Sequence, residues 1–191
     1  MIARLFKTSH SPRSAVFLDR DGTLIEDIGY LRRPEDIVWF PDTFNALRRL
    51  TKHFLLFVVS NQSGIAAGLL SEAEVDRVNR HIDDALRAAS IPIQRWYVCP
   101  HSREDECDCM KPAPRFLKEA RRDFQVSLKT SFAIGDHPHD VTFIESQGGT
   151  GLYLLTGHGA KHRAELPEGT ATCSTLSAAV DTILSTVGQY R

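Results

Sequence analysis

Short apolar runs alternate with amphipathic stretches along this chain, and the two patterns predict different secondary structures. Runs rich in β-branched and aromatic residues, without polar interruption, are typical of strands buried on both faces of a sheet. Two such runs are strong, and three more are weaker versions of the same signal. We expect strands at residues 15–18, 54–59, 96–98, 132–134 and 152–155.

Apolar residues at helical spacing lie between these runs and predict helices that connect the strands. The clearest helix begins with a capping box at Ser71 and Glu74. Its apolar face consists of Val75, Val78, Ile82 and Leu86. Further helices are expected from about Asp42, over Arg115–Phe124 and from about Leu176.

The alternation of strands and helices implies right-handed βαβ units and therefore a parallel sheet with helices on both faces. We expect a three-layer α/β/α fold, in which ligands bind beyond the carboxyl ends of the strands. Residues 1–13 are expected to form an N-terminal extension and residues 14–191 a single domain, since no repeat or long linker divides them. Residues 157–172 are expected to be an irregular segment before the last helix.

Composition and charge exclude several other classes of protein. The chain has 191 residues and a formal net charge of -1, so we expect no bulk electrostatic attraction to nucleic acid or to an anionic membrane. No apolar run approaches the roughly 20 residues that a membrane-spanning helix needs. The basic N-terminal segment lacks a continuous apolar stretch and is a poor secretory signal. A cytoplasmic location is therefore expected.

Polar side chains that could take part in catalysis or binding follow the first two predicted strands. Asp19 and Asp21 come directly after the first strand, where Gly22 allows a tight turn that points both carboxylates into one site. Ser60 and Asn61 come after the second strand, where a hydroxyl and exposed backbone amides suit phosphate oxygens. Each of these elements is also common in ordinary turns, so neither is specific alone.

The later strands are followed by a lysine and by two more carboxylates. Lys111 lies in a loop, where it could neutralise a phosphoryl group during transfer, although a lone lysine in a loop is usually only solvated. Asp136 and Asp140 follow the fourth predicted strand. Together with the two earlier aspartates they make four loop carboxylates, and clustered hard oxygen ligands suit Mg²⁺.

Three of the four cysteines lie close together with a histidine. Cys99, His101, Cys107 and Cys109 have the spacing C-x-H-x₅-C-x-C, which satisfies a closed tetrahedral Zn²⁺ site. The alternative is a set of free thiols beside a surface histidine. A closed site leaves no coordination position for water, so we expect a structural zinc that fixes the loop containing Lys111.

The ordered set Asp-x-Asp-Gly-Thr, Ser-Asn, Lys and Gly-Asp-x-x-x-Asp resembles the four motifs of the haloacid dehalogenase superfamily of phosphatases. The resemblance covers residues 15 to about 155. It implies that Asp19 attacks phosphorus and forms an aspartyl-phosphate, which splits one difficult displacement into two. It also implies that Asp21 protonates the leaving alkoxide and then activates water.

The same resemblance assigns the metal and the phosphate-binding residues. Mg²⁺ would be held by Asp19, by the backbone carbonyl of Asp21 and by Asp136, while Asp140 would orient these ligands. The phosphoryl oxygens would be bound by Ser60, the backbone amide of Asn61 and Lys111. The substrate implied is a small phosphorylated metabolite, and the protein is expected to act as a monomer.

Longer segments are similar to one branch of that superfamily, the D-glycero-D-manno-heptose 1,7-bisphosphate 7-phosphatases. These segments are Leu-Asp-Arg-Asp-Gly-Thr-Leu, Ser-Asn-Gln-Ser-Gly-Ile and the zinc loop followed by Lys-Pro. Histidinol-phosphate phosphatases share the zinc loop, but their pattern has Asn-Gln-Asp-Gly where this chain has Ser63 as the third residue. Both kinds lack a separate cap domain, and residues 26–39 are expected to form a flap over the site.

Two departures from that branch leave the bisphosphate specificity open. Ala67 and Met110 stand where the heptose bisphosphate phosphatases commonly have arginine, which would help to hold the second phosphate. Other residues could contact the substrate instead, with a solvated surface as the alternative for each. These candidates are Arg32, Arg33, His137 and His139.

Three other functions are considered. Hydrolysis of histidinol phosphate or another small phosphorylated metabolite is the nearest alternative. A nucleic-acid 3′-phosphatase is disfavoured because the chain has no basic excess and no interleaved aromatic residues. A non-catalytic, zinc-stapled interaction module would be expected to have a broken catalytic set, and every motif residue is present.

Overall fold

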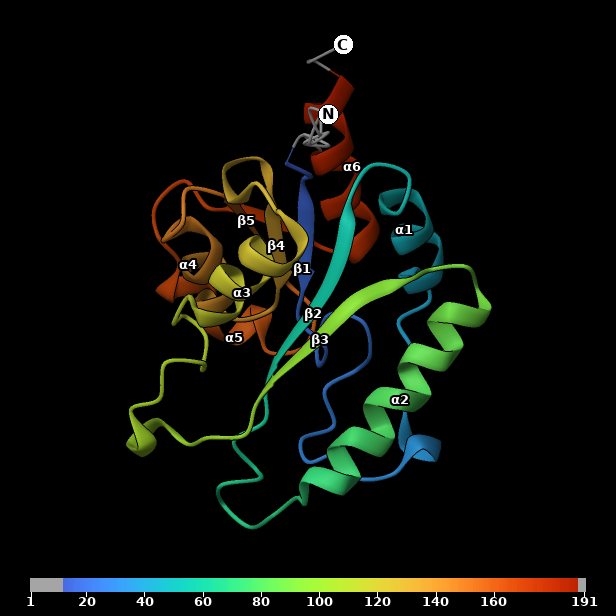
Figure 1. Cartoon of the computed structure of the whole chain (residues 1–191), viewed down its shortest axis with the longest axis vertical. Coiled ribbons are helices and arrows are strands. Elements are labelled where there is room, and N and C mark those ends of the chain that lie inside the picture. The colour runs from blue at the N-terminus through green and yellow to red at the C-terminus, as the bar shows by residue number, and fades with distance from the viewer. Residues whose placement is uncertain (1–11, 189–191) are drawn as a thin grey trace, which may run out of the picture.

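The computed structural model describes residues 12–188, in which the strands form one six-stranded sheet with the order β3-β2-β1-β4-β5-β6 (Figure 1). Every pairing in this sheet is parallel. The strands are β1 (Ala15–Leu18), β2 (Leu55–Asn61), β3 (Ile93–Cys99), β4 (Phe132–Gly135), β5 (Thr150–Leu154) and β6 (Ala171–Cys173). The predicted parallel sheet is therefore confirmed.

Helices connect the strands and cover both faces of the sheet. The α-helices are α1 (Thr43–Leu50), α2 (Glu72–Ala88), α3 (Arg115–Phe124), α4 (Pro138–Glu145), α5 (Gly159–His162) and α6 (Leu176–Gly188). The described part of the chain also has four short 3₁₀ helices: η1 (Pro34–Asp36), η2 (Arg103–Asp105), η3 (Leu128–Thr130) and η4 (Arg163–Glu165). Figure 1 shows α3 and α4 on one side of the sheet and α1, α2 and α6 on the other.

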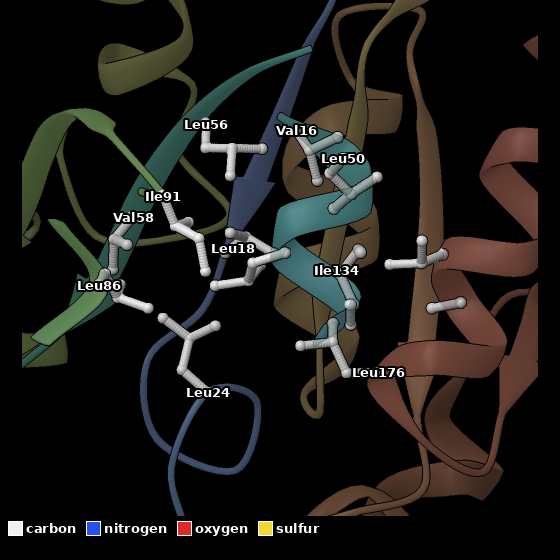
Figure 2. Packing of buried hydrophobic residues seen from close by; sticks show 14 of the residues in the cluster. Val16, Leu18, Leu24, Leu50, Leu56, Val58, Leu86, Ile91, Ile134 and Leu176 are labelled. Carbon is white, nitrogen blue, oxygen red and sulfur yellow. The ribbon is translucent and has the colours of Figure 1, made fainter. Parts of the chain in front are cut away.

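Alternate residues of each central strand point to opposite faces of the sheet, and each face has its own apolar core. In β1, Val16 and Leu18 belong to one core, whereas Ala15 and Phe17 belong to the other. The first core includes residues of α1, α2 and α6, and Figure 2 shows part of it. The second is closed by residues of α3 and α4. The predicted three-layer α/β/α fold is confirmed by this arrangement.

The strand order fixes where a ligand can bind. Successive strands are added outward from β1 to β2 and β3, and the chain then returns to place β4 on the other side of β1. A crevice opens outside the carboxyl ends of the strands at such a reversal. Asp19 directly follows β1, and Asp136 directly follows β4. The fold therefore places both aspartates at this crevice.

Two elements differ from the sequence-based expectation. Residues 157–172 are not wholly irregular, because they contain α5, η4 and the first two residues of β6. Strand β6 is only three residues long and two of them are exposed, so its apolar signal is weak. Helix α4 was not predicted, because Pro138, Asp140, Val141, Phe143 and Ile144 are all buried and leave no alternating polar face.

Two further expectations concern the N-terminal extension and a separate cap domain. Residues 1–11 of the predicted N-terminal extension lie outside the described residues, while the backbone of Arg13 is hydrogen-bonded to Gln125 and Ser127. The connections between β1 and β4 consist of helices and loops, so residues 12–188 contain no separate cap domain. Over the same residues no helix is both long and apolar enough to cross a membrane.

Candidate active site

Lys111 lies at the centre of the site and joins two of the predicted aspartates. Its Nζ donates to Asp19 Oδ1 at 2.8 Å, to Asp140 Oδ1 at 2.5 Å and to the carbonyl of Val59 at 2.8 Å. The side chain is only 5% exposed. Burial alone would lower the pKa of Lys111, but the carboxylates of Asp140 and Asp19 outweigh that effect and raise it. Lys111 is therefore held as a cation.

Three carboxylates converge around this lysine. Oxygen atoms of Asp19, Asp136 and Asp140 all lie within 4.8 Å of one another. Burial raises the pKa of Asp136 to about 8, and the negative charges of Asp19 and Asp140 add to the increase. Such crowding is unfavourable without a further cation, and carboxylate oxygens are the ligands that Mg²⁺ takes in proteins. The residues present therefore fit a divalent metal site.

Asp140 differs from the other two aspartates because both of its carboxylate oxygens already accept hydrogen bonds within the protein. Oδ1 accepts the bond from Lys111, and Oδ2 accepts from the backbone N–H of His137 at 3.1 Å, at the start of α4. Asp136 has one occupied oxygen, Oδ2, which accepts from the backbone N–H of His158 at 2.7 Å. Asp140 is thus placed to orient its neighbours, while Asp136 keeps a free oxygen.

Two glycines allow three loops to approach one another around Asp136. A Cβ on Gly22 would lie 2.1 Å from Asp136 Oδ2, and one on Gly157 would lie 2.2 Å from the same atom. Both glycines also have positive φ, +72° and +49°. Thr156 adds a bond from its Oγ1 to the carbonyl of Gly22 at 2.5 Å. Sequence reasoning noted Gly22 but missed Gly157, because no local pattern shows that residues so far apart in the chain meet.

Asp21 is held by side chains that the sequence did not single out. The buried guanidinium of Arg20 pairs with Asp21 at 2.8 Å, and Gln62 Nε2 donates to Asp21 Oδ2 at 2.9 Å and to Ser60 Oγ at 2.8 Å. Burial raises the pKa of Asp21 above its usual value, although Arg20 opposes this shift. A carboxyl group that retains its proton more readily is suited to general acid catalysis.

The side chain of Asn61 holds the loop that carries Lys111. Its Oδ1 accepts from the backbone N–H of Lys111 at 3.0 Å, and its Nδ2 donates to the backbone carbonyl of Lys111 at 3.3 Å. Since both ends of this side chain are used, only its backbone amide is left for a ligand, which is the group that the sequence predicted. Asn61 therefore fixes the position of the lysine as well as its own amide.

All seven predicted residues of the magnesium and phosphate sites line one cavity of about 680 Å³. These residues are Asp19, Asp21, Ser60, Asn61, Lys111, Asp136 and Asp140. The predicted flap contributes Asp27, Gly29 and Tyr30, and its base is joined by the backbone pairing of Ile25 with Trp39. Nucleophile, acid and cation candidates thus meet in a space that can hold a small phosphorylated molecule.

The candidate substrate contacts divide into two groups. His137 and His139 line the cavity and stack with ring centroids 4.4 Å apart. Burial, together with nearby imidazoles, lowers the pKa of His137 to about 4, so it is neutral near neutral pH. Arg32 and Arg33 are exposed and do not line the cavity, and Arg33 pairs with Asp36 at 2.7 Å. Arg103, which the sequence did not suggest, does line it.

The four predicted zinc ligands also converge. Cys99 Sγ lies 3.0 Å from Cys109 Sγ and 3.6 Å from Cys107 Sγ, and His101 Nδ1 lies 3.2 Å from Cys109 Sγ. No disulfide joins them. A tetrahedron whose corners lie about 2.0–2.3 Å from a central ion has edges of roughly 3.5–3.8 Å, and these separations are similar or somewhat shorter. The cluster begins at the last residue of β3 and ends two residues before Lys111, so the residues present fit zinc at the base of the lysine loop.

A parallel α/β sheet with these carboxylates and a buried lysine at its point of reversal defines a phosphatase of the haloacid dehalogenase (HAD) type. The family model described as HAD-hydrolase-like matches residues 108–179. A D-glycero-β-D-manno-heptose-1,7-bisphosphate 7-phosphatase of Bordetella bronchiseptica is 31% identical over 173 residues, which are 88% of this chain and 97% of that protein. The Escherichia coli K12 protein of the same name is 33% identical over 160 residues, 79% of this chain and 84% of that one.

A solved structure supports the same assignment. The D,D-heptose 1,7-bisphosphate phosphatase of B. bronchiseptica, complexed with magnesium and phosphate, has a TM-score of 0.81 and 30% identity, covering 91% of this chain and 99% of that one. The chain belongs to the family of HAD-like phosphatases that contains the D-glycero-β-D-manno-heptose-1,7-bisphosphate 7-phosphatases. The resemblance predicted from the motifs is confirmed.

Gly157→Ala is expected to raise the Mg²⁺ concentration needed for half-maximal phosphatase activity by about 10- to 100-fold, the usual effect of disturbing the support of a metal ligand. The added Cβ would force Asp136 to move. Gly169→Ala is the matched control, because Gly169 also has positive φ (+82°) but open space around its Cβ. Mg²⁺ titrations of both variants measure the effect, and equal requirements would contradict a metal site at Asp136.

Proposed function

We propose that this chain is a Mg²⁺-dependent phosphomonoesterase that removes the 7-phosphate from D-glycero-D-manno-heptose 1,7-bisphosphate. The observation that carries the proposal is the Lys111 ammonium between Asp19 and Asp140, in a cavity that Asp136 also lines. A phosphate dianion can approach a carboxylate only where cations compensate both charges. The names of the relatives support the choice of sugar phosphate over histidinol phosphate.

Two aspartates divide the chemistry between them. Asp19 Oδ attacks phosphorus, so that an oxygen–phosphorus bond forms at Asp19 while the bond to the sugar oxygen breaks. Asp21 gives its proton to that sugar oxygen. In the second step Asp21 takes a proton from water, whose oxygen attacks phosphorus and releases Asp19. At the end of the second step Asp19 is free again and Asp21 is protonated again, so both residues are ready for another turnover.

The remaining residues bind and neutralise the phosphoryl group. Lys111, Ser60 Oγ and the backbone amide of Asn61 bind its oxygens, and Lys111 offsets their developing charge. Mg²⁺ would be held by Asp19, Asp136 and the backbone carbonyl of Asp21. Mg²⁺, when bound there, supplies positive charge against the phosphoryl oxygens. Asp140 orients Lys111, because its Oδ1 accepts from that ammonium.

Zinc in the cluster of Cys99, His101, Cys107 and Cys109 is proposed to be structural. Four protein ligands close the coordination shell, so no position remains for substrate or water. Cys109 precedes Lys111 by two residues and is buried, as is Cys99 at the end of β3. A metal bound to both ends of this loop restricts the backbone from which Lys111 reaches into the cavity.

Asp19→Asn is expected to lower kcat on heptose 1,7-bisphosphate by roughly 10³-fold or more, because an amide cannot form the covalent intermediate. Asp84→Asn, an exposed position on α2, is the matched control for the same chemical change and is expected to keep full activity. Steady-state kinetics with Mg²⁺ measure both. A folded Asp19→Asn protein that keeps a tenth of the wild-type kcat would contradict nucleophilic catalysis by Asp19.

Purified protein is expected to contain about one zinc per chain, as four-ligand stoichiometry requires. Cys107→Ala is expected to lose that zinc, whereas Cys173→Ala, outside the cluster, retains it. Zinc-selective chelation with Mg²⁺ in excess is expected to lower the melting temperature, because metal bound only to the folded state stabilises it. Elemental analysis and thermal unfolding measure these effects, and a zinc-free protein with an unchanged melting curve rules out a structural zinc.

Met110→Arg is expected to raise kcat/KM for the 1,7-bisphosphate relative to heptose 7-phosphate. Ala67 and Met110 line the cavity and carry no charge, whereas a charge-assisted bond to phosphate contributes about 1.5–3 kcal/mol. That free energy corresponds to about a 10- to 100-fold change in the ratio of kcat/KM for the bisphosphate to kcat/KM for the monophosphate. Met110→Gln, of similar length and without charge, is the control. If the wild type already prefers the bisphosphate by about a hundredfold and arginine adds nothing, another group binds the second phosphate.

A further inference from the structure

Arg20 lies between the two catalytic aspartates in the sequence and is completely buried. Its guanidinium makes contacts on two sides. Nε donates to both oxygens of Asp21 at 3.1 Å, and Nη2 donates to Asp21 Oδ2 at 2.8 Å. Nη1 points the other way and donates to Asn79 Oδ1 at 2.8 Å. Arg20 therefore connects Asp21 with helix α2.

The two oxygens of Asp21 have different surroundings as a result. Oδ2 accepts from Arg20 Nη2, from Gln62 Nε2 at 2.9 Å and, in part, from Arg20 Nε. Among the described residues, Oδ1 accepts only the shared, longer bond from Arg20 Nε. A protonated carboxyl oxygen is itself a donor and cannot face several N–H groups. Oδ1 is therefore the oxygen of Asp21 that is better placed to carry a proton.

Asn79 fixes the far end of this chain of contacts. It lies on α2 between Val78 and Ile82, both fully buried in the core, and it is itself only 7% exposed. It also lines a groove of about 430 Å³ between α2 and β3, together with Asp76 and Trp96. This groove is separate from the catalytic cavity, whose lining does not include Asn79.

We propose that Arg20 and Asn79 are positioning residues that hold Asp21 with Oδ1 directed to the substrate oxygen. The proposal rests on the proposed function, in which Asp21 is the acid and base. Burial of a guanidinium is costly unless it is paired and hydrogen-bonded. The bidentate bond to Asp21 and the anchor on Asn79 offset this cost, and they leave the carboxyl group one orientation. Arg20 itself does not line the catalytic cavity.

The proton transfers give this orientation a measurable consequence. In the first step the oxygen–phosphorus bond forms at Asp19, the bond to the leaving oxygen breaks, and the proton on Asp21 Oδ1 moves to that oxygen. A primary alkoxide is a poor leaving group and needs this proton, whereas 4-nitrophenolate leaves readily without it. Misplacement of Asp21 therefore slows the first step for alkyl phosphates and spares it for aryl phosphates.

The test acts on Asn79, because any smaller residue at Arg20 would open a cavity in the buried loop. Asn79→Leu removes the acceptor for Nη1, whereas Asn79→Asp keeps an oxygen at the same place. Asp76→Asn is the matched control, since Asp76 lines the same groove one helical turn earlier and bonds to Arg80 rather than Arg20. For each variant, kcat/KM is measured on heptose 7-phosphate and on 4-nitrophenyl phosphate, with Asp21→Asn as the reference for complete loss of the acid.

Asn79→Leu is expected to lower kcat/KM on the alkyl phosphate by about 10- to 100-fold, the usual cost of a misplaced catalytic group. The same variant should change the aryl phosphate by less than about threefold. Asn79→Asp is expected to restore the alkyl activity to near wild type, and Asp76→Asn to leave both substrates unchanged.

Equal losses on the two substrates in Asn79→Leu would overturn the proposal, because they would show a general structural role. No loss on either substrate would overturn it as well. The Asp21→Asn reference separates this failure from failure of the proposed function. If Asp21→Asn discriminates strongly between the substrates and Asn79→Leu does not, only the positioning role is wrong. If Asp21→Asn does not discriminate, Asp21 is not the acid and both ideas fail.

Discussion

The structure depends on the compensation of negative charge at one edge of the sheet. The strand order brings Asp19 and Asp136 to neighbouring strand ends, and Asp140 joins them from the first turn of α4. Three carboxylates within this space repel one another, and burial together with the charges of Asp19 and Asp140 raises the pKa of Asp136. Lys111 supplies one compensating charge inside the protein, and a divalent cation bound by these carboxylates would supply the rest. The same positive charge would also bind the phosphate. The fold and the proposed catalysis therefore both need positive charge at this edge of the sheet.

Lys111 can compensate these negative charges only if its ammonium group is held in place, and several independent contacts hold it. Lys111 donates to Asp19 after β1, to the carbonyl of Val59 within β2 and to Asp140 in the first turn of α4. The side chain of Asn61 holds its backbone from both sides. The cluster of three cysteines and a histidine lies in the loop immediately before it. These contacts come from distant parts of the chain, so the lysine is fixed by the whole fold rather than by its own loop.

The sequence was sufficient for features that depend on local pattern or on short motifs. Buried strands such as Ala15–Leu18, the capping box of α2 and the spacing of the cysteines are all local signals. What it could not give are contacts between residues that are far apart and have no periodic pattern. Gly157 against Asp136 is one example, and the bond between Arg20 and Asn79 is another. Helix α4 and strand β6 were missed for a related reason, since one lacks a polar face and the other lacks a buried run.

The central claim is that Asp19 becomes covalently phosphorylated, and mass spectrometry tests it most directly. The Asp21→Asn protein is mixed with Mg²⁺ and 4-nitrophenyl phosphate, then quenched in acid and digested. Because this leaving group needs no acid whereas hydrolysis of the aspartyl-phosphate needs a base, the intermediate should accumulate. The account predicts one added phosphoryl group on the peptide that contains Asp19. Release of 4-nitrophenolate without phosphorylation of that peptide, or with phosphorylation elsewhere, would contradict it.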